Sequence, residues 1–116
     1  MTKLINLTPH ALSFQIGDAS LTIPPSGDVA LVQVSSSVLT TLDVDGLHIP
    51  VRQSSYGAVN GLPDPQPGIV FLVSLLVQQA LLAAGVQRGD VMGPDTGPSA
   101  IRVNGQVSAV VALQKI

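Results

Sequence analysis

The feature that most limits the possible folds is an uncharged apolar segment between Ile69 and Val86. Its length is close to the minimum for a membrane span, which needs roughly 17–25 residues. However, Gln78 and Gln79 interrupt its middle, Ser74 divides it, and no basic cluster flanks it. We therefore interpret it as a strand followed by a helix, and we expect no membrane association.

The strand is expected at Ile69–Val73 and the helix at Leu75–Ala84. Ser74 suits the N-cap, because its hydroxyl can accept a hydrogen bond from the first turn, and Gly85 suits the left-handed end. On a helical wheel Gln78 and Gln79 lie side by side, which leaves most of the circumference apolar. Such a helix has to be covered nearly all round. Because one thin sheet cannot cover it, we expect a second subunit as a lid.

Elsewhere, short runs of Val, Ile, Leu and Thr alternate with turn residues, which is typical of antiparallel strands. Asp43-Val-Asp45-Gly46 and Asn104-Gly105 predict hairpin turns, since Asp, Asn and Gly tolerate a positive φ. The proline-rich passage 62–68 predicts a stiff connector inside one domain. The other expected strands are Leu4–Leu7, Ala11–Gln15, Ser20–Ile23, Val29–Val34, Val38–Leu42, Leu47–Arg52, Ala58–Val59, Ala100–Val103 and Gln106–Leu113. We predict a single α+β domain over residues 1–116: a mostly antiparallel sheet, open or barrel-like, with one apolar helix near residues 75–84.

The charge content narrows the possible partners. Charged residues are only 10% of the chain, against a usual share of about a quarter. A monomer would expose much uncharged surface, so a homo-oligomer is expected. The net charge is −2 and the five basic residues are scattered, which argues against duplex nucleic acid. One small anionic ligand held by one or two arginines stays compatible.

The absence of cysteine excludes disulfides, thiolate chemistry and cysteine-based zinc sites. The first ten residues contain no apolar core of signal-peptide length, so a cytoplasmic location is expected. His10 and His48 are the only histidines, and no further ligand lies at a helical spacing from either. Asp43-Val-Asp45-Gly46 resembles the opening of a calcium loop but lacks its third ligand and closing Glu. We expect neither a metal nor a cofactor.

The best candidate site is the loop expected from Arg88 to Ser99. Its three glycines let the backbone approach a ligand, and exposed N–H groups can bind anionic oxygens. Arg88 at the helix exit and Arg102 beyond the loop suit bidentate phosphate or carboxylate contacts, and Asp90 and Thr96 complete the expected contacts. In the alternative interpretation Arg88 caps helix carbonyls and the glycines only form turns.

Phe71 has two interpretations: a core residue, or one of the chain's three aromatic side chains stacked on a ligand ring. Catalysis finds little support, because the chain contains no Gly-x-Ser-x-Gly motif. Asp90 and Asp95 could form an acid–base pair, but no environment is evident that would separate their pKa values. We expect a protein that is not an enzyme.

Several short motifs recur over most of the chain in an order typical of small phage-encoded proteins. They are Asn6-Leu-Thr-Pro-His10, Pro25-Ser26-Gly27, Gly61-Leu62-Pro63, Phe71-Leu-Val-Ser74, Arg88-Gly-Asp90-Val and Arg102. The chain resembles a family of small, uncharacterised phage and prophage proteins. It is also similar to the phage proteins that sequester cyclic nucleotide immune signals, the Thoeris anti-defence sponges.

The resemblance implies an oligomeric, non-enzymatic binder in the host cytoplasm, which captures a cyclic ADP-ribose-like molecule at a subunit interface. Phosphate contacts would come from Arg88 and Arg102, and stacking on the base from Phe71. One position departs from the pattern, which has an arginine a few residues after Pro-Ser-Gly, where this chain has Asp28-Val-Ala-Leu31. The alternatives are a structural or interaction protein, such as a virion accessory component, and a small hydrolase using Asp90 and Asp95.

Overall fold

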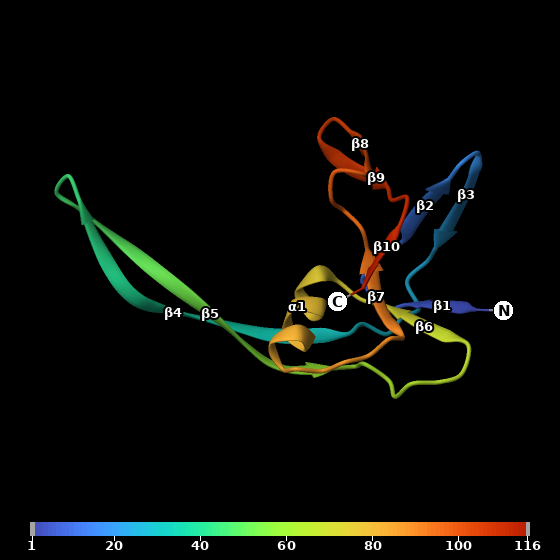
Figure 1. The fold of residues 1–116 in the computed structure, drawn as a ribbon, viewed down its shortest axis with the longest axis horizontal. Coiled ribbons are helices and arrows are strands. Elements are labelled where there is room, and N and C mark those ends of the chain that lie inside the picture. Colours follow the sequence, from blue (N-terminus) through green and yellow to red (C-terminus); the bar gives the residue numbers. More distant parts are fainter. Residues whose placement is uncertain (1, 116) are drawn as a thin grey trace.

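The computed structural model describes residues 2–115, which form a small folded body and one long arm (Figure 1). The arm is the hairpin of β4 (Leu31–Val44) and β5 (Leu47–Asn60). Its tip is the turn between these strands, and its root is the opposite end, where it meets the body. The radius of gyration is 17.4 Å and the longest axis measures 59 Å. A compact chain of this length has a radius of about 13 Å, so the arm projects well beyond the body.

The body is built on a four-stranded mixed sheet with the order β1-β6-β7-β10. Its strands are β1 (Lys3–Asn6), β6 (Ile69–Leu72), β7 (Val91–Pro94) and β10 (Leu113–Lys115). β6 runs parallel to both β1 and β7, and β10 is antiparallel to β7. β6 is thus an inner strand, which explains why its sequence is apolar throughout.

The two faces of β6 point into two apolar clusters. Phe71 is 1% exposed and packs with Leu7, Val77 and other residues under the helix, whereas Leu72 is fully buried on the opposite face beside Phe14. A strand covered on both faces has no polar side to alternate with. The buried strand expected at Ile69–Val73 is confirmed.

The helix α1 (Leu75–Ala83) follows β6 directly and confirms the expected helix. The Ser74 hydroxyl accepts a hydrogen bond from the backbone of the first turn at 3.3 Å. At the other end Gly85 has φ 71°, and the Val86 N–H donates to the Leu81 carbonyl at 3.0 Å. This is a Schellman motif, in which glycine takes up the left-handed conformation that ends the helix.

The two glutamines of α1 do not share one environment, although they are neighbours on the helical wheel. Gln78 is 1% exposed, and its Nε2 donates to the Gln114 carbonyl at 3.0 Å. Gly93 on β7 makes this possible, because a Cβ there would lie 2.4 Å from Gln78 Oε1. The body leaves another part of the helix surface uncovered. Its exposed large apolar residues are Leu75, Leu76 and Leu82.

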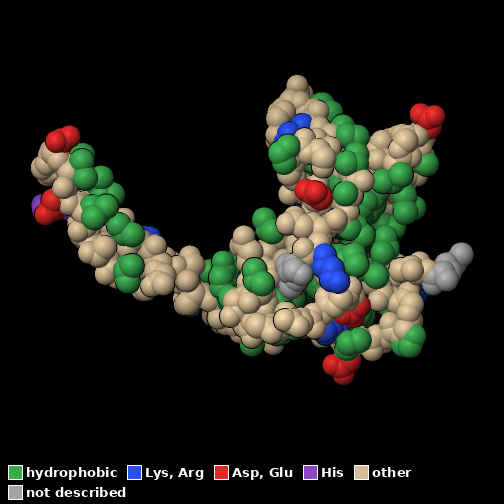
Figure 2. All heavy atoms as spheres, in the orientation of Figure 1, with side chains coloured by type: hydrophobic (Ala, Val, Ile, Leu, Met, Phe, Trp, Pro, Cys, Tyr) green, Lys and Arg blue, Asp and Glu red, His purple; other side chains and the backbone are tan. Residues whose placement is uncertain are grey.

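Two further hairpins complete the body: β2 (Leu12–Ile16) with β3 (Ala19–Ile23), and β8 (Ile101–Val103) with β9 (Gln106–Ala109). They stand side by side (Figure 1), joined where the Val110 N–H donates to the Ser13 carbonyl at 2.9 Å. Figure 2 shows few charged side chains on the face that it presents, and apolar side chains over both hairpins and along the arm.

Both expected hairpin turns are confirmed. Asp45 and Gly46 have φ values of 50° and 83°, and Asn104 and Gly105 have 53° and 80°. Two consecutive positive φ values define the type I′ turn, whose twist matches that of paired strands. Asp43-Val-Asp45-Gly46 therefore forms the arm tip.

The α+β class with an open, β-rich sheet is confirmed, and three boundary predictions need correction. The strands expected at Val29–Val34 and Val38–Leu42 are one long strand, β4, and β5 likewise joins Leu47–Arg52 to Ala58–Val59. The serine-rich middle of β4 contains no Gly, Pro, Asn or Asp, and register shifts occur on either side of it. The strand expected at Gln106–Leu113 is divided into β9 and β10. No helix among the described residues is long and apolar enough to span a membrane.

Candidate functional site

The predicted Arg88–Ser99 loop is not one continuous loop, because β7 runs through its middle as an inner strand of the sheet. Asp90 lies immediately before this strand, and Asp95 and Thr96 come just after it. Four strand residues span roughly 13 Å. The sequence-predicted residues therefore fall into two groups, Arg88 with Asp90 and Thr96 with Arg102, at opposite ends of β7. The structure thus brings Arg88 and Asp90 together and does not join them to Thr96 and Arg102.

Arg88 and Asp90 form a bidentate ion pair. Nε and Nη2 of Arg88 donate to the two carboxylate oxygens at 2.7 and 2.8 Å, and Nη2 also donates to the Pro63 carbonyl at 2.9 Å. The two side chains are 17% and 19% exposed. The guanidinium thus ties the proline-rich connector to the start of β7, rather than capping the helix. Among the described residues, Nη1 of Arg88 makes no hydrogen bond.

This ion pair shifts the pKa values of both groups. The hydrogen bonds from Arg88 hold the pKa of the Asp90 carboxyl below its usual value, although burial acts in the opposite direction. The same hydrogen bonds raise the pKa of Arg88. Asp90 is therefore a fixed anion that orients Arg88, which makes it a poor proton acceptor for catalysis.

The other end of β7 is held by Arg102. Its Nη1 and Nη2 donate to the carbonyls of Gly97 and Thr96 at 3.0 and 2.7 Å. Asp95 Oδ1 accepts a hydrogen bond from the Gly97 N–H at 3.0 Å, which forms a local turn. Here the arginine satisfies backbone carbonyls, and Thr96 contributes its main chain. Asp90 and Asp95, separated by β7, do not form an acid–base pair.

Phe71 lies between the helix and the sheet and offers no ring face to a ligand. Other residues of the recurring motifs also have structural roles. Asn6 is 1% exposed, and its Nδ2 donates to the His10 carbonyl at 2.8 Å while its Oδ1 accepts from the Thr8 hydroxyl at 2.6 Å. Gly61 has φ 85°, and a Cβ there would lie 2.5 Å from the Val29 carbonyl oxygen. Asn6 and Gly61 thus stabilise a turn and a close approach of two backbone segments in the body.

The candidate site is a hollow of about 360 Å³ beside the end of α1 and Arg88. Its apolar wall consists of Leu82 and Val86, which are 64% and 37% exposed. Lys115 reaches it from β10, and its Nζ would lie 3.6 Å from a Cβ on Gly89. The remaining lining residue is Gln87. The hollow combines an apolar wall with two cationic side chains, which suits an anionic ligand with an apolar or planar part. We call it the Lys115 hollow.

Sequence reasoning missed Lys115, because it lies far from Arg88 in the chain. The antiparallel pairing of β10 with β7, in which Lys115 lies opposite Met92, brings the two cations together. Within residues 2–115, Lys115 has no salt bridge to an acidic side chain. No group of three potential metal ligands occurs in this part of the chain.

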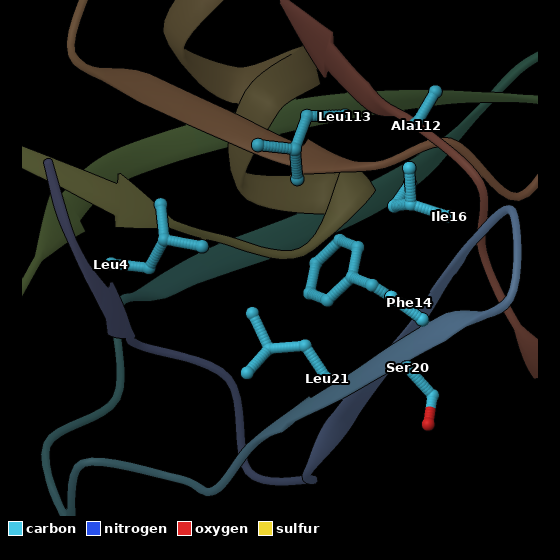
Figure 3. A pocket seen from close by; sticks show the side chains of 8 residues that line it. Leu4, Phe14, Ile16, Ser20, Leu21, Ala112 and Leu113 are labelled. Carbon is cyan, nitrogen blue, oxygen red and sulfur yellow. The ribbon is translucent and has the colours of Figure 1, made fainter.

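A second hollow, of about 400 Å³, lies between the β2–β3 hairpin and the sheet (Figure 3). Its lining comes from β1, β2, β3 and the C-terminal segment, and the Ser20 hydroxyl points away from the Phe14 ring. The lining residues are Leu4, Phe14, Ile16, Ala19, Ser20, Leu21, Ala112 and Leu113. A site without inward polar groups cannot orient a nucleotide, so we distinguish this apolar hollow from the Lys115 hollow.

Comparison of the chain with protein-family models, curated proteins and solved structures found no match.

Proposed function

We propose that the protein is a non-enzymatic binding protein that captures a small anionic, nucleotide-like ligand of the cyclic ADP-ribose class and withholds it from its receptor. It acts as a homo-oligomer in the cytoplasm of a phage-infected host. The observation that carries this proposal is the Lys115 hollow, where two cations flank an apolar wall. The motif resemblance supplies the ligand class.

The ion pair with Asp90 prepares Arg88 for binding. Two of its nitrogens are engaged by Asp90 and Pro63, so the guanidinium is fixed before a ligand arrives, and Nη1 is left to contact a phosphate oxygen. A fixed group loses little conformational entropy on binding. The wall of Leu82 and Val86 gives a base an apolar surface. The lining contains no Ser, Thr, Cys, His, Asp or Glu side chain, which supports holding rather than cleavage.

The proposal is tested first on the purified protein. Heat denaturation should release an intact phosphorylated small molecule, detected by mass spectrometry, or the unloaded protein should bind added cyclic ADP-ribose in calorimetry. A cleaved product would contradict binding without turnover. Absence of both the released molecule and cyclic ADP-ribose binding would overturn the proposal.

Two variants locate the site. Lys115→Met should weaken cyclic ADP-ribose binding about tenfold or more, because a charge-assisted contact contributes roughly 1.5–3 kcal/mol. Arg102→Gln, which changes a cation at the other end of β7, should leave the affinity unchanged. The reverse result would place the ligand beside Thr96 and Arg102 and overturn the assignment to the Lys115 hollow.

A structural or interaction protein, such as a virion accessory component, is the second candidate, and the arm is the observation that favours it. An exposed hairpin with many apolar side chains is suited to binding another protein surface. Such a component should co-purify with phage particles and bind no nucleotide, whereas the sponge should stay with the soluble fraction of infected cells.

A further inference from the structure

The arm tip carries an apolar surface that has no cover within the described residues. Leu42 pairs with Ile49 and Val44 with Leu47, two residues apart along each strand, so all four side chains lie on one face. Their exposed fractions are 53% for Leu42, 44% for Ile49, 46% for Val44 and 66% for Leu47. We call them the tip cluster. Asp43 and His48, whose side chains form a hydrogen bond, lie on the opposite face.

Most arm residues between the root and the tip are exposed as well. The Tyr56 hydroxyl, near the root, donates to Gln79 on α1 at 3.4 Å, and beyond the root the two strands extend alone (Figure 1). A two-stranded hairpin by itself is at best marginally stable in water. Between the root and the Asp43–His48 contact at the tip, Arg52 is the only charged residue in the sequence of either strand. These properties are typical of a surface that is covered in the assembled protein.

The apolar hollow on the body has complementary properties. Its rim residues Ile16 and Leu21 are 59% and 54% exposed, and Phe14 lies deeper, at 7%. The Leu4 and Leu113 side chains face the Phe14 ring across the space (Figure 3). No charged residue lines the hollow. An apolar cluster can therefore enter it without leaving a charge unpaired.

The tip cluster of the same chain cannot reach this hollow. Each arm strand contains 14 residues, a length of about 46 Å at the usual rise, and the arm leaves the body on the side away from the β2–β3 hairpin (Figure 1). The occupant has to come from another molecule. A second copy of this chain presents a matching tip and an identical hollow.

We propose that two copies exchange arms, with the tip cluster of each seated in the apolar hollow of the other. Reciprocal exchange closes the assembly, because each copy gives one tip and receives one. Each copy contributes the four residues of its tip cluster and the eight that line its hollow, so the exchange forms two equivalent apolar contacts. The inference rests on the homo-oligomer in the proposed function and adds which surfaces meet.

Cross-linking tests the contact directly, because the chain contains no cysteine. After mild oxidation of the full-length double variant Leu21→Cys/Leu47→Cys, most chains should migrate as a disulfide-linked dimer on a non-reducing gel. The matched control Leu21→Cys/Leu39→Cys uses a leucine that is 65% exposed on the same arm but outside the tip. It should cross-link several-fold less, as should each single variant.

The mass in solution provides a second readout. The wild-type protein should have at least the mass of a dimer in light scattering, and Leu47→Glu should shift it to the monomer. Val103→Glu, at a 59% exposed position on β8, should leave the mass unchanged. A monomeric wild type would overturn both the exchange and the homo-oligomer. If the protein is an oligomer but Leu21→Cys/Leu47→Cys cross-links no more than the controls, the exchange alone is overturned. Neither result depends on ligand capture.

Discussion

The body and the arm contain the same kinds of residue, yet apolar side chains are buried in the body and exposed on the arm. In β6, Phe71 and Leu72 are at most 1% exposed, whereas in β4 Leu39 and Leu42 are 65% and 53% exposed. β6 has a strand on each side and an apolar cluster on each face. β4 has one partner strand. The number of covering layers, rather than the residue type, thus decides whether an apolar strand becomes core.

The polar side-chain contacts of the body and the arm show the same contrast. Arg88 and Asp90 are less than a fifth exposed and share three hydrogen bonds with each other and Pro63. Asp43 and His48, at the arm tip, are about three-quarters exposed. Water and salt screen an exposed pair, which therefore contributes little to stability. The body should carry most of the stability of an isolated chain.

The largest expected effect comes from removing the central core side chain. Phe71→Ala should lower the free energy of unfolding by about 3–5 kcal/mol, because it leaves a cavity between α1 and the sheet. Urea denaturation measures the loss. Leu39→Ala, on the arm, should change it by about 0.5 kcal/mol or less. A loss for Leu39→Ala as large as that for Phe71→Ala would show that the middle of the arm is buried in solution.

Adding a methyl group to a glycine should also destabilise the body more than the arm, by a smaller amount than Phe71→Ala. Gly93→Ala should destabilise the protein by about 1–3 kcal/mol, because the new Cβ would lie 2.4 Å from Gln78 Oε1 and 3.0 Å from the Val73 carbonyl oxygen. The arm glycine Gly57 is the matched control, since its Cβ would meet the Gln33 carbonyl oxygen at 3.3 Å. Thermal unfolding should show a clear loss only for Gly93→Ala.

If Gln78 is the obstacle, shortening it should relieve part of the strain in Gly93→Ala. The double variant Gly93→Ala/Gln78→Ala should therefore lose less stability than the sum of its single variants. Strict additivity would show that the backbone of Val73, rather than the Gln78 side chain, limits the approach.

The smallest expected effect is the pH-dependent contribution of Asp90. Its pKa is lowered in the folded state, so its stabilisation is complete above the unfolded value of about 3.9 and is lost as the pH falls through the folded value. Asp90→Asn should cost about 1–2 kcal/mol near neutral pH, and the difference from wild type should shrink in urea titrations below about pH 4. Asp43→Asn should have no measurable effect at either pH. A deficit of Asp90→Asn that stays constant down to pH 2 would contradict the ionic origin of the stabilisation.

The elements with strong local signals were predictable. Ser74 and Gly85 define the helix ends, the Asp-Gly and Asn-Gly pairs define two hairpins, and the uncharged run at Ile69–Val73 predicts a buried strand. Each of these signals acts through a few neighbouring residues, so it does not depend on the rest of the fold.

The candidate site was predicted only in part. Arg88 and Asp90 are neighbours, but the sequence predicts a loop where β7 lies, because Gly93 and Pro94 are typical turn residues. The close approach of the Gln78 side chain and the Val73 carbonyl gives Gly93 its role inside a strand. Lys115 could not be assigned at all, since nothing near it in sequence points to Arg88.

The sequence by itself thus determined the class of the fold, the helix with its caps, the tight turns and the low charge of the surface. Only the tertiary structure decided that β1, β6 and β7 pair in parallel, that Arg88 is held by Asp90 and Pro63, and that β4 and β5 leave the body as a bare arm. The physical reason is the sequence separation of the residues that interact. Caps and turns are satisfied within a few residues, whereas strand pairing and burial depend on segments that meet only when the chain has folded.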